Sequence, residues 1–249
     1  KDAGGNPVPN ATVTFAALTG TNSSTGTFAT ATAPTGPDGI ATASTLTANT
    51  KAGTFTVNAT VTGAASPAAF TMTNTAGAPS TITANGGGGQ SAAINAAFGQ
   101  TLSVLVKDAH ENVVNNATIV FTTPAQTGAS GNFAAGTVTT NASGIANSTV
   151  LTANSKVGTY NVTANFTANG GAAVPASFSM TNTPGAPASI TITGGDNQSA
   201  EGSKPFATQL KVTVKDSGGN LVPNASVTFA APPQTGPSAT FAPAPGVAR

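Results

Sequence analysis

The residues that could do acid–base chemistry are few in this chain of 249 residues. The carboxylates number only seven: Asp2, Asp38, Asp108, Glu111, Asp196, Glu201 and Asp216. Acid–base catalysis needs ionisable groups within hydrogen-bond reach of one another, and glycoside hydrolysis needs two carboxylates at one bond. No two carboxylates recur together here, and Asp2, Asp108 and Asp216 are one position of an internal repeat. We therefore expect no catalytic residue, no cofactor-binding residue and no enzyme activity.

Metal binding is not indicated either. His110 is the only histidine, and it replaces Gly4 and Gly218 of the other copies. A triad or a histidine metal site would need partners that those copies lack, so a solvated turn residue is the better interpretation. Calcium sites usually use several convergent carboxylates or carbonyls, and the linkers 74–79 and 182–187 contain no acid. We expect no metal site and no cofactor.

Three further motifs have simple interpretations. The pairs Lys1/Asn74 and Lys107/Asn182 recur as an isopeptide cross-link would require, but no buried acid is evident to assist, so we expect solvated lysines at strand ends. The many Asn-X-Ser/Thr sequons arise by chance in a chain this rich in Asn, Thr and Ser, and we expect none to be glycosylated. The four glycines at 86–89 lack a following Lys-Ser/Thr, so they predict a flexible strand connection rather than a phosphate loop.

Composition excludes several classes of partner and chemistry. Charged residues make up 6% of the chain, against roughly 25% in an average soluble protein. The formal net charge is +1 and there is no basic stripe, so we expect no nucleic-acid partner. Cysteine is absent, which excludes disulfides and thiol chemistry. No apolar run reaches the ~18 residues of a membrane-spanning helix.

The chain contains one sequence pattern three times. The motif that begins Lys1-Asp2 and ends at Phe15 returns from Lys107 to Phe121 and from Lys215 to Phe229, at offsets of 106 and 108 residues. This period is too long for a solenoid unit and has the size of a small domain. We expect three immunoglobulin-like repeats: 1–79, lacking its N-terminal strands; 80–187, complete; and 188–249, truncated at its C-terminal side. The 249 residues are then an internal fragment of a longer array.

Apolar and polar residues alternate within each repeat, which is typical of half-buried strands. Leu102, Val104 and Val106 form one such series, and the others in the complete repeat are Ala117/Ile119/Phe121, Tyr160/Val162/Ala164/Phe166 and Phe178/Met180. No helical period is present, so the pattern predicts an all-β fold. The aromatic residues fall on repeat-equivalent positions, and we expect them in the core. The segment 145–151 breaks the alternation and predicts a bulge.

Several segments resemble a known family. Val104 to Asp108, followed by Asn112 to Phe121, is similar to the bacterial immunoglobulin-like repeat of the invasin and intimin type, the Big-1 group. Residues 139–146 and 158–164 also fit that pattern. The resemblance implies tandem two-sheet sandwiches of about seven strands. It also implies a stalk of an exported bacterial surface protein, whose receptor-binding residues lie in a terminal domain that is not present here.

We therefore expect structural stalk or spacer repeats of a secreted or surface-anchored bacterial adhesin-like protein, located outside the cell or on its surface. Its partners are the neighbouring repeats and, through domains not present, a host or surface protein or a glycan. Two alternatives stay open: a carbohydrate- or protein-binding module, and the spacer region of a secreted hydrolase. The binding residues are unknown at this point.

Overall fold

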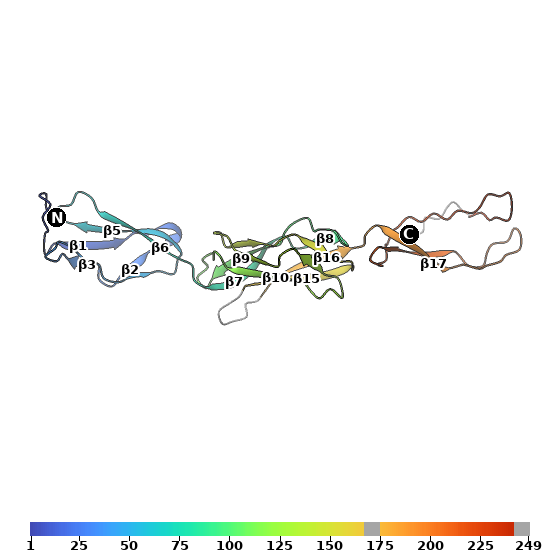
Figure 1. Cartoon of the computed structure of the whole chain (residues 1–249), viewed down its shortest axis with the longest axis horizontal. Coiled ribbons are helices and arrows are strands. Elements are labelled where there is room, and N and C mark those ends of the chain that lie inside the picture. The colour runs from blue at the N-terminus through green and yellow to red at the C-terminus, as the bar shows by residue number, and fades with distance from the viewer. Residues whose placement is uncertain (167–174, 242–249) are drawn as a thin grey trace.

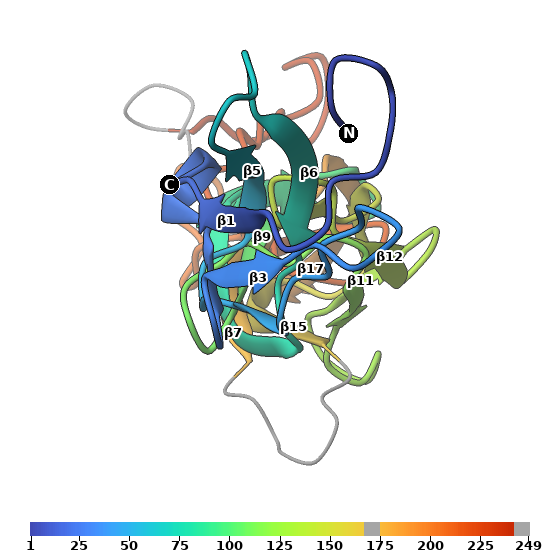
Figure 2. The ribbon, with the colours of Figure 1, turned by 90° about the vertical axis from the view of Figure 1, so that its left-hand side faces the viewer.

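The computed structural model describes residues 1–166 and 175–241. These residues form an elongated molecule in which three groups of strands follow one another along the long axis (Figure 1). Seen along that axis, the repeats lie behind one another (Figure 2). Apart from a short 3-10 turn at Thr21–Ser23, the regular elements described are all strands. None of the helical structure described is long and apolar enough to cross a membrane.

The middle repeat is a sandwich of two layers. One layer is a five-stranded sheet in the order β12 (Thr137–Thr139), β10 (Thr118–Thr122), β15 (Gly158–Phe166), β16 (Ala176–Thr183) and β8 (Gln90–Ala93). The other layer combines a three-stranded sheet with a two-stranded one: β13 (Ile145–Asn147), β9 (Ser103–Asp108) and β7 (Pro79–Gly86), then β11 (Gly131–Phe133) and β14 (Leu151–Ala153). The predicted all-β immunoglobulin-like fold is confirmed.

The alternating residues of the middle repeat form its core, as the pattern predicted. Leu102, Val104 and Val106 of the chain leading into and along β9 are fully buried, and so are Ile119 and Val162 of the opposite sheet. The other members of the three remaining series are buried as well: Ala117, Phe121, Tyr160, Ala164, Phe166, Phe178 and Met180. Every second residue of these strands therefore points toward the opposite sheet, and the contacts between these side chains hold the two layers together.

The chain crosses between the two layers at the four glycines, on the way from β7 to β8. Gly87 and Gly89 have positive φ, and a Cβ on Gly87 would overlap the Thr101 carbonyl oxygen, so only glycine fits there. The Gln90 side chain donates to the carbonyl oxygens of Gly87 and Gln100. It also accepts a 2.8 Å hydrogen bond from the Gln100 amide. The crossing is thus held in place, where we had predicted a flexible connection.

The break in alternation at 145–151 is not a bulge, and that prediction was wrong. The chain leaves β13 in one sheet and enters β14 in another sheet of the same layer, so the alternation is interrupted between the two strands. Ser148 closes the crossing, because its amide donates to the Leu102 carbonyl oxygen at 2.8 Å and its hydroxyl accepts from the Leu102 amide at 3.0 Å. Register shifts occur instead in the pairing of β7 with β9.

The outer repeats contain fewer sheets. The first has a four-stranded sheet, β3 (Thr32–Pro34), β1 (Thr12–Ala17), β5 (Gly53–Val61) and β6 (Ala68–Asn74), and the pair β2 (Gly26–Phe28) and β4 (Leu46–Ala48). The third has the pair β17 (Pro187–Gly194) and β18 (Lys211–Asp216).

The aromatic residues are core residues in the middle repeat but not in every copy. Phe98 and Phe178 are buried there, whereas their equivalents Phe206 and Phe70 are exposed in the outer repeats. The prediction of buried aromatics therefore holds in the middle repeat and for Phe15 and Phe55 of the first repeat, but not for Phe70 and Phe206.

Candidate functional site

A cluster of polar side chains connects each repeat to the next. At the start of the middle repeat, β9 ends in a turn from Asp108 to Asn112. Oδ1 of Asp108 accepts hydrogen bonds from the backbone amides of His110 (2.8 Å) and Asn112 (3.0 Å). Its Oδ2 accepts from the Asn112 side chain (2.9 Å) and from the amide of Gly77 (2.8 Å) in the linker from the first repeat. The carboxylate thus ties its own turn to the linker.

The Asn112 side chain extends these contacts to the body of the first repeat. Its Nδ2 donates to the Thr50 carbonyl oxygen at 2.8 Å, and its Oδ1 accepts from the Ala52 amide at 2.9 Å. Lys51 Nζ donates to the His110 carbonyl oxygen at 3.0 Å. We call this set of contacts the first joint. One amide side chain pairs there with a donor and an acceptor of the neighbouring backbone, which fixes both distance and orientation.

The contacts of the Asp and Asn side chains recur at the second joint, between the middle and third repeats. Asp216 accepts from the amides of Gly185 (3.0 Å), Gly218 (2.9 Å) and Asn220 (2.9 Å). Asn220 Nδ2 donates to the Ser155 carbonyl oxygen at 2.9 Å, and Oδ1 accepts a long 3.5 Å contact from the Val157 amide.

The turn is also formed at the start of the chain, where no described repeat precedes it. Asp2 Oδ1 accepts from the amides of Gly4 and Asn6, both at 2.9 Å, and the Asn6 side chain donates to the same carboxylate. The turn is therefore built by its own five residues, as expected for an Asp side chain that caps a turn. The turn therefore does not need contacts with a preceding repeat to adopt its conformation.

The loop that receives the turn is organised by two asparagines. In the middle repeat, Asn182 Nδ2 lies 2.8 Å from the Ser130 carbonyl oxygen and 3.0 Å from both Asn154 Oδ1 and the Lys156 carbonyl oxygen. The equivalent residue of the first repeat makes the equivalent contacts at 3.0 to 3.2 Å: Asn74 with Thr25, Asn49 and Lys51. Buried amide networks of this kind hold a loop in one conformation.

The second joint also has an apolar contact. Ile94 is buried, and a Cβ on Gly218 would lie 3.0 Å from its Cδ1 atom and would overlap the Ser155 carbonyl oxygen. A Cβ on Gly185 would lie 3.1 Å from Ile94 Cγ1. The third repeat thus approaches the middle one so closely that glycine is required at 218, whereas the first joint has the exposed His110 there.

The electrostatics of the joints follow from these contacts. Burial by itself would raise the pKa of Asp108, but the hydrogen bonds from the Asn112 side chain and from three backbone amides outweigh it and lower the pKa to about 2. The pKa of Asp216 is lowered by the equivalent hydrogen bonds, against the same effect of burial. Both carboxylates are therefore ionised acceptors at neutral pH.

The other residues considered from the sequence lie apart from one another. Within residues 1–166 and 175–241, no three His, Cys, Asp or Glu side chains come together as metal ligands would. Lys107 Nζ forms a 2.8 Å ion pair with Glu111 beside the first joint. Asn182 lies at the opposite end of the middle repeat, where it contacts Lys156. The geometry does not bring this lysine–asparagine pair together.

The role of Asn112 and Asn220 across the joints was not predicted from the sequence, which indicated only a turn. The signal was present, because an Asp followed four residues later by Asn occurs in all three copies. Asn154 and Asn182 also recur, as Asn49 and Asn74. Recurrence alone does not tell whether such a side chain bonds within its own repeat or to the neighbouring one.

Comparison with solved structures shows the same fold in a known protein. The chain is similar to the structure of FdeC, described as a broadly conserved Escherichia coli adhesin, with a TM-score of 0.54 and 22% identity over 92% of this chain and 70% of that chain. It therefore has the fold of that structure, tandem immunoglobulin-like sandwiches.

Two further structures match with TM-scores below 0.5. The D0-D1 domain of intimin matches at 0.30 with 23% identity, over 72% of this chain and 86% of that chain. Domains 4–9 of the surface layer protein SbsC match at 0.37 with 16% identity, over 96% of this chain and 34% of that chain. No protein-family model and no curated protein matches the sequence.

Proposed function

We propose that the chain is a stalk region of a bacterial surface or secreted adhesin-like protein, whose repeats hold a binding domain located elsewhere at a set distance. Each repeat is then one domain, with limits at 1–79, 80–187 and 188–249. The support is the elongated arrangement (Figure 1), the fold shared with an adhesin, and the resemblance of the repeat motif to the Big-1 group. The partners of each repeat are its neighbours in the chain.

The observation that carries this proposal is the repetition of one joint. Two joints, 108 residues apart, use Asp and Asn at equivalent positions to bond the linker and the preceding loop. Pro79 and Pro187 begin the first strands after the two linkers, where they restrict both their own φ and the residue before them. Such joints limit bending, which a spacer needs and a set of independent binding modules does not.

The exposed phenylalanines do not favour a carbohydrate-binding module. Phe70 and Phe206 are equivalent to buried core residues of the middle repeat, so their exposure reflects an uncovered core face. An aromatic platform for sugars would instead be exposed in the repeat that has both layers.

Spin-label distances across the first joint test the proposal. Because the chain has no cysteine, the exposed Thr14 and Thr137 can be replaced by cysteine as unique labelling sites. We expect a narrow distance distribution in the parent chain and a broad one with Asn112→Ala, which removes the contacts to Thr50 and Ala52.

The matched control is Asn147→Ala, since this exposed asparagine lies on β13 away from the joint, and it should leave the distribution narrow. An equally broad distribution in the parent chain would contradict a spacer function.

A further inference from the structure

The chain enters and leaves the middle repeat at opposite ends of its sandwich. β7 begins beside the first joint, because Pro79 pairs with Asp108, whose carboxylate bonds the linker at Gly77. β16 ends at Thr183, two residues before Gly185, which bonds the third repeat at the second joint. Tension along the elongated molecule (Figure 1) would therefore pull β7 toward the first repeat and β16 toward the third.

β7 is the outer strand of its sheet and is bonded along its length to β9. Six pairs of residues join these antiparallel strands, from Pro79 with Asp108 to Gly86 with Ser103. Tension on the linker acts along β7, so β7 can leave only by sliding past β9, and the bonds of the ladder share the force. A pull across the strands would break the same bonds one after another.

The amides that hold β7 can be identified from the bonds of β9. The amide of Val106 donates to the Gly144 carbonyl oxygen, on the β13 side of β9. Successive residues of a strand turn their backbone groups to opposite sides, so Leu105 turns its groups toward β7. Its partner there is Thr83. The amide of Thr83 therefore belongs to the ladder, whereas the amide of the next residue, Ala84, faces away from β9.

A second ladder follows the glycine crossing. β8 runs parallel to β16 over four pairs of residues. Bonds just outside the strands extend this ladder at both ends: the Gly89 amide donates to the Ser179 carbonyl oxygen at 2.8 Å, and the Ile94 amide to the Thr183 carbonyl oxygen at 2.9 Å. Once β7 has yielded, tension would pull β8 toward the first repeat and β16 toward the third, so this ladder is also loaded along its strands.

We propose that the middle repeat carries tension along the stalk, and that the β7–β9 ladder is the first part to resist it, with the β8–β16 ladder behind it. This inference rests on the proposed function, because a stalk between an anchored end and a bound domain is pulled along its axis. It adds a mechanical task to the spacing of a binding domain.

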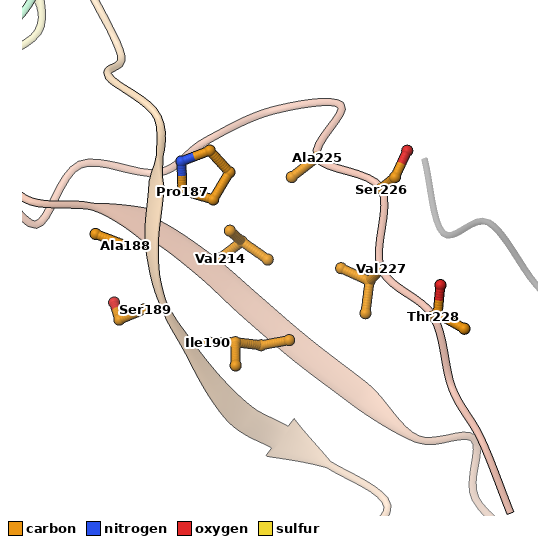
Figure 3. Close-up of a pocket in the computed structure, with 9 residues that line it drawn as sticks. All are labelled: Pro187, Ala188, Ser189, Ile190, Val214, Ala225, Ser226, Val227 and Thr228. Carbon is orange, nitrogen blue, oxygen red and sulfur yellow. The ribbon is translucent and has the colours of Figure 1, made fainter.

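The third repeat should contribute little resistance. Among the described residues up to 241, it contains only the strand pair β17–β18. Figure 3 shows the side chains of Ile190, Val214 and Val227 around an open hollow of about 400 Å³ beside these strands. An isolated pair of strands is marginally stable, so it should unfold at low force and leave the event of the middle repeat distinct.

Optical tweezers that pull the full chain by its two ends test the proposal. Unfolding of residues 80–187 releases about 360–390 Å of extended chain, less the length of the folded repeat, which identifies its event. Thr83→Pro removes one amide of the ladder and should lower the unfolding force of the middle repeat by about half.

Ala84→Pro is the matched control. Thr83 and Ala84 are neighbours with exposed side chains on an outer strand, where proline is tolerated if its nitrogen faces away from the sheet. The Ala84→Pro chain should therefore unfold close to the force of the parent chain.

The direction of pulling gives a second test that leaves the ladder amides unchanged. Because the chain has no cysteine, cysteines in place of the exposed Asn85 on β7 and Asn147 on β13 allow pulling across the strands of the same sheet. The unfolding force should then be about threefold lower than between the chain ends, because bonds of similar strength break one at a time.

Two results would overturn the proposal: equal unfolding forces in the two directions, or a folded Thr83→Pro chain that unfolds at the force of the parent. Far-UV circular dichroism shows whether each proline variant retains its sheet content; if Thr83→Pro does not, the direction of pulling decides alone. Should either result accompany a narrow spin-label distribution across the first joint, the spacer function stands and only the mechanical task is removed.

Discussion

Phe121 shows at the residue scale how the two layers of the middle repeat are packed together. Its ring lies 5.8 Å from the ring of Phe133 and 6.3 Å from that of Phe178, measured between centroids, so it joins the two layers of the sandwich. Such tilted aromatic pairs add to the stabilisation from buried apolar area.

Phe121→Ala should therefore lower the free energy of unfolding of the middle repeat by about 3–5 kcal/mol, through lost transfer energy and the cavity left behind. The chain has one tyrosine, Tyr160, and no tryptophan, so tyrosine fluorescence in a urea titration reports this repeat alone. Val120→Ala is the control, because Val120 points to the exposed side of the same strand and should cost far less. Equal costs for the two changes would contradict the assignment of the core face.

The position shared by His110 and Gly218 should respond differently at the two joints. Gly218→Ala places a Cβ against the Ser155 carbonyl oxygen and Ile94, so it should widen the label distances between Thr137 and Thr191 across the second joint. His110→Gly should leave the distribution of label distances across the first joint narrow. It should change the free energy of unfolding by no more than about 0.5 kcal/mol, as at most exposed sites. If Gly218→Ala had no effect on the distances, the close approach at the second joint would be excluded.

At the scale of elements, the Asp–Asn turn should make the joints sensitive to acid. The pKa of Asp108 is about 2 in the folded chain, below its ordinary value near 3.8. A carboxylate with a depressed pKa stabilises the folded form fully above its unfolded pKa, and this contribution is lost as the pH falls through the folded value. The first joint should stay closed at pH 7 and loosen between about pH 4 and pH 2.

The label pair Thr14/Thr137 measures this opening, and Asp108→Asn should weaken the joint at pH 7 and remove most of the pH dependence. A distance distribution that is unchanged at pH 2 would show that the carboxylate does not hold the joint.

The antiparallel strand pairs at the same position of different repeats should also differ. β7 and β9 are covered by the opposite sheet, whereas β17 and β18 form a two-stranded pair with an exposed face. Two strands alone are marginally stable in water. Amides of Val212 and Val214 should therefore exchange with deuterium much faster than those of Val104 and Val106 in dilute, monomeric protein. Equal protection would mean that the third repeat is as well packed as the middle one.

For the whole molecule, the complete core of the middle repeat predicts independent folding. Residues 80–187 expressed alone should melt in one cooperative transition, with the same midpoint by Tyr160 fluorescence and by far-UV circular dichroism. The joints would then set the orientation of neighbouring repeats relative to one another, and the middle repeat would fold without them. A coil-like spectrum for residues 80–187 would contradict the proposed domain limits.

The amino-acid sequence by itself determined the all-β fold, the period of the repeat and the core face of each long strand. Alternation of apolar residues is a local property, because successive side chains of a strand point to opposite sides. Leu102, Val104, Ile119 and Val162 could therefore be placed inside without a structure. Only the tertiary structure showed that the chain changes sheets near Ser148, since a broken alternation looks the same for a bulge and for a crossing.

The joints and the exposed faces were decided by the tertiary structure as well. Asn112 bonds Thr50 across 62 residues of chain, and no local pattern states which backbone groups a side-chain amide will meet after folding. Phe70 and Phe178 lie in nearly identical strands, yet one is exposed and the other is buried. The difference is whether a second sheet lies opposite the strand, because burial depends on the surroundings that distant parts of the chain supply and not on the residue or its strand.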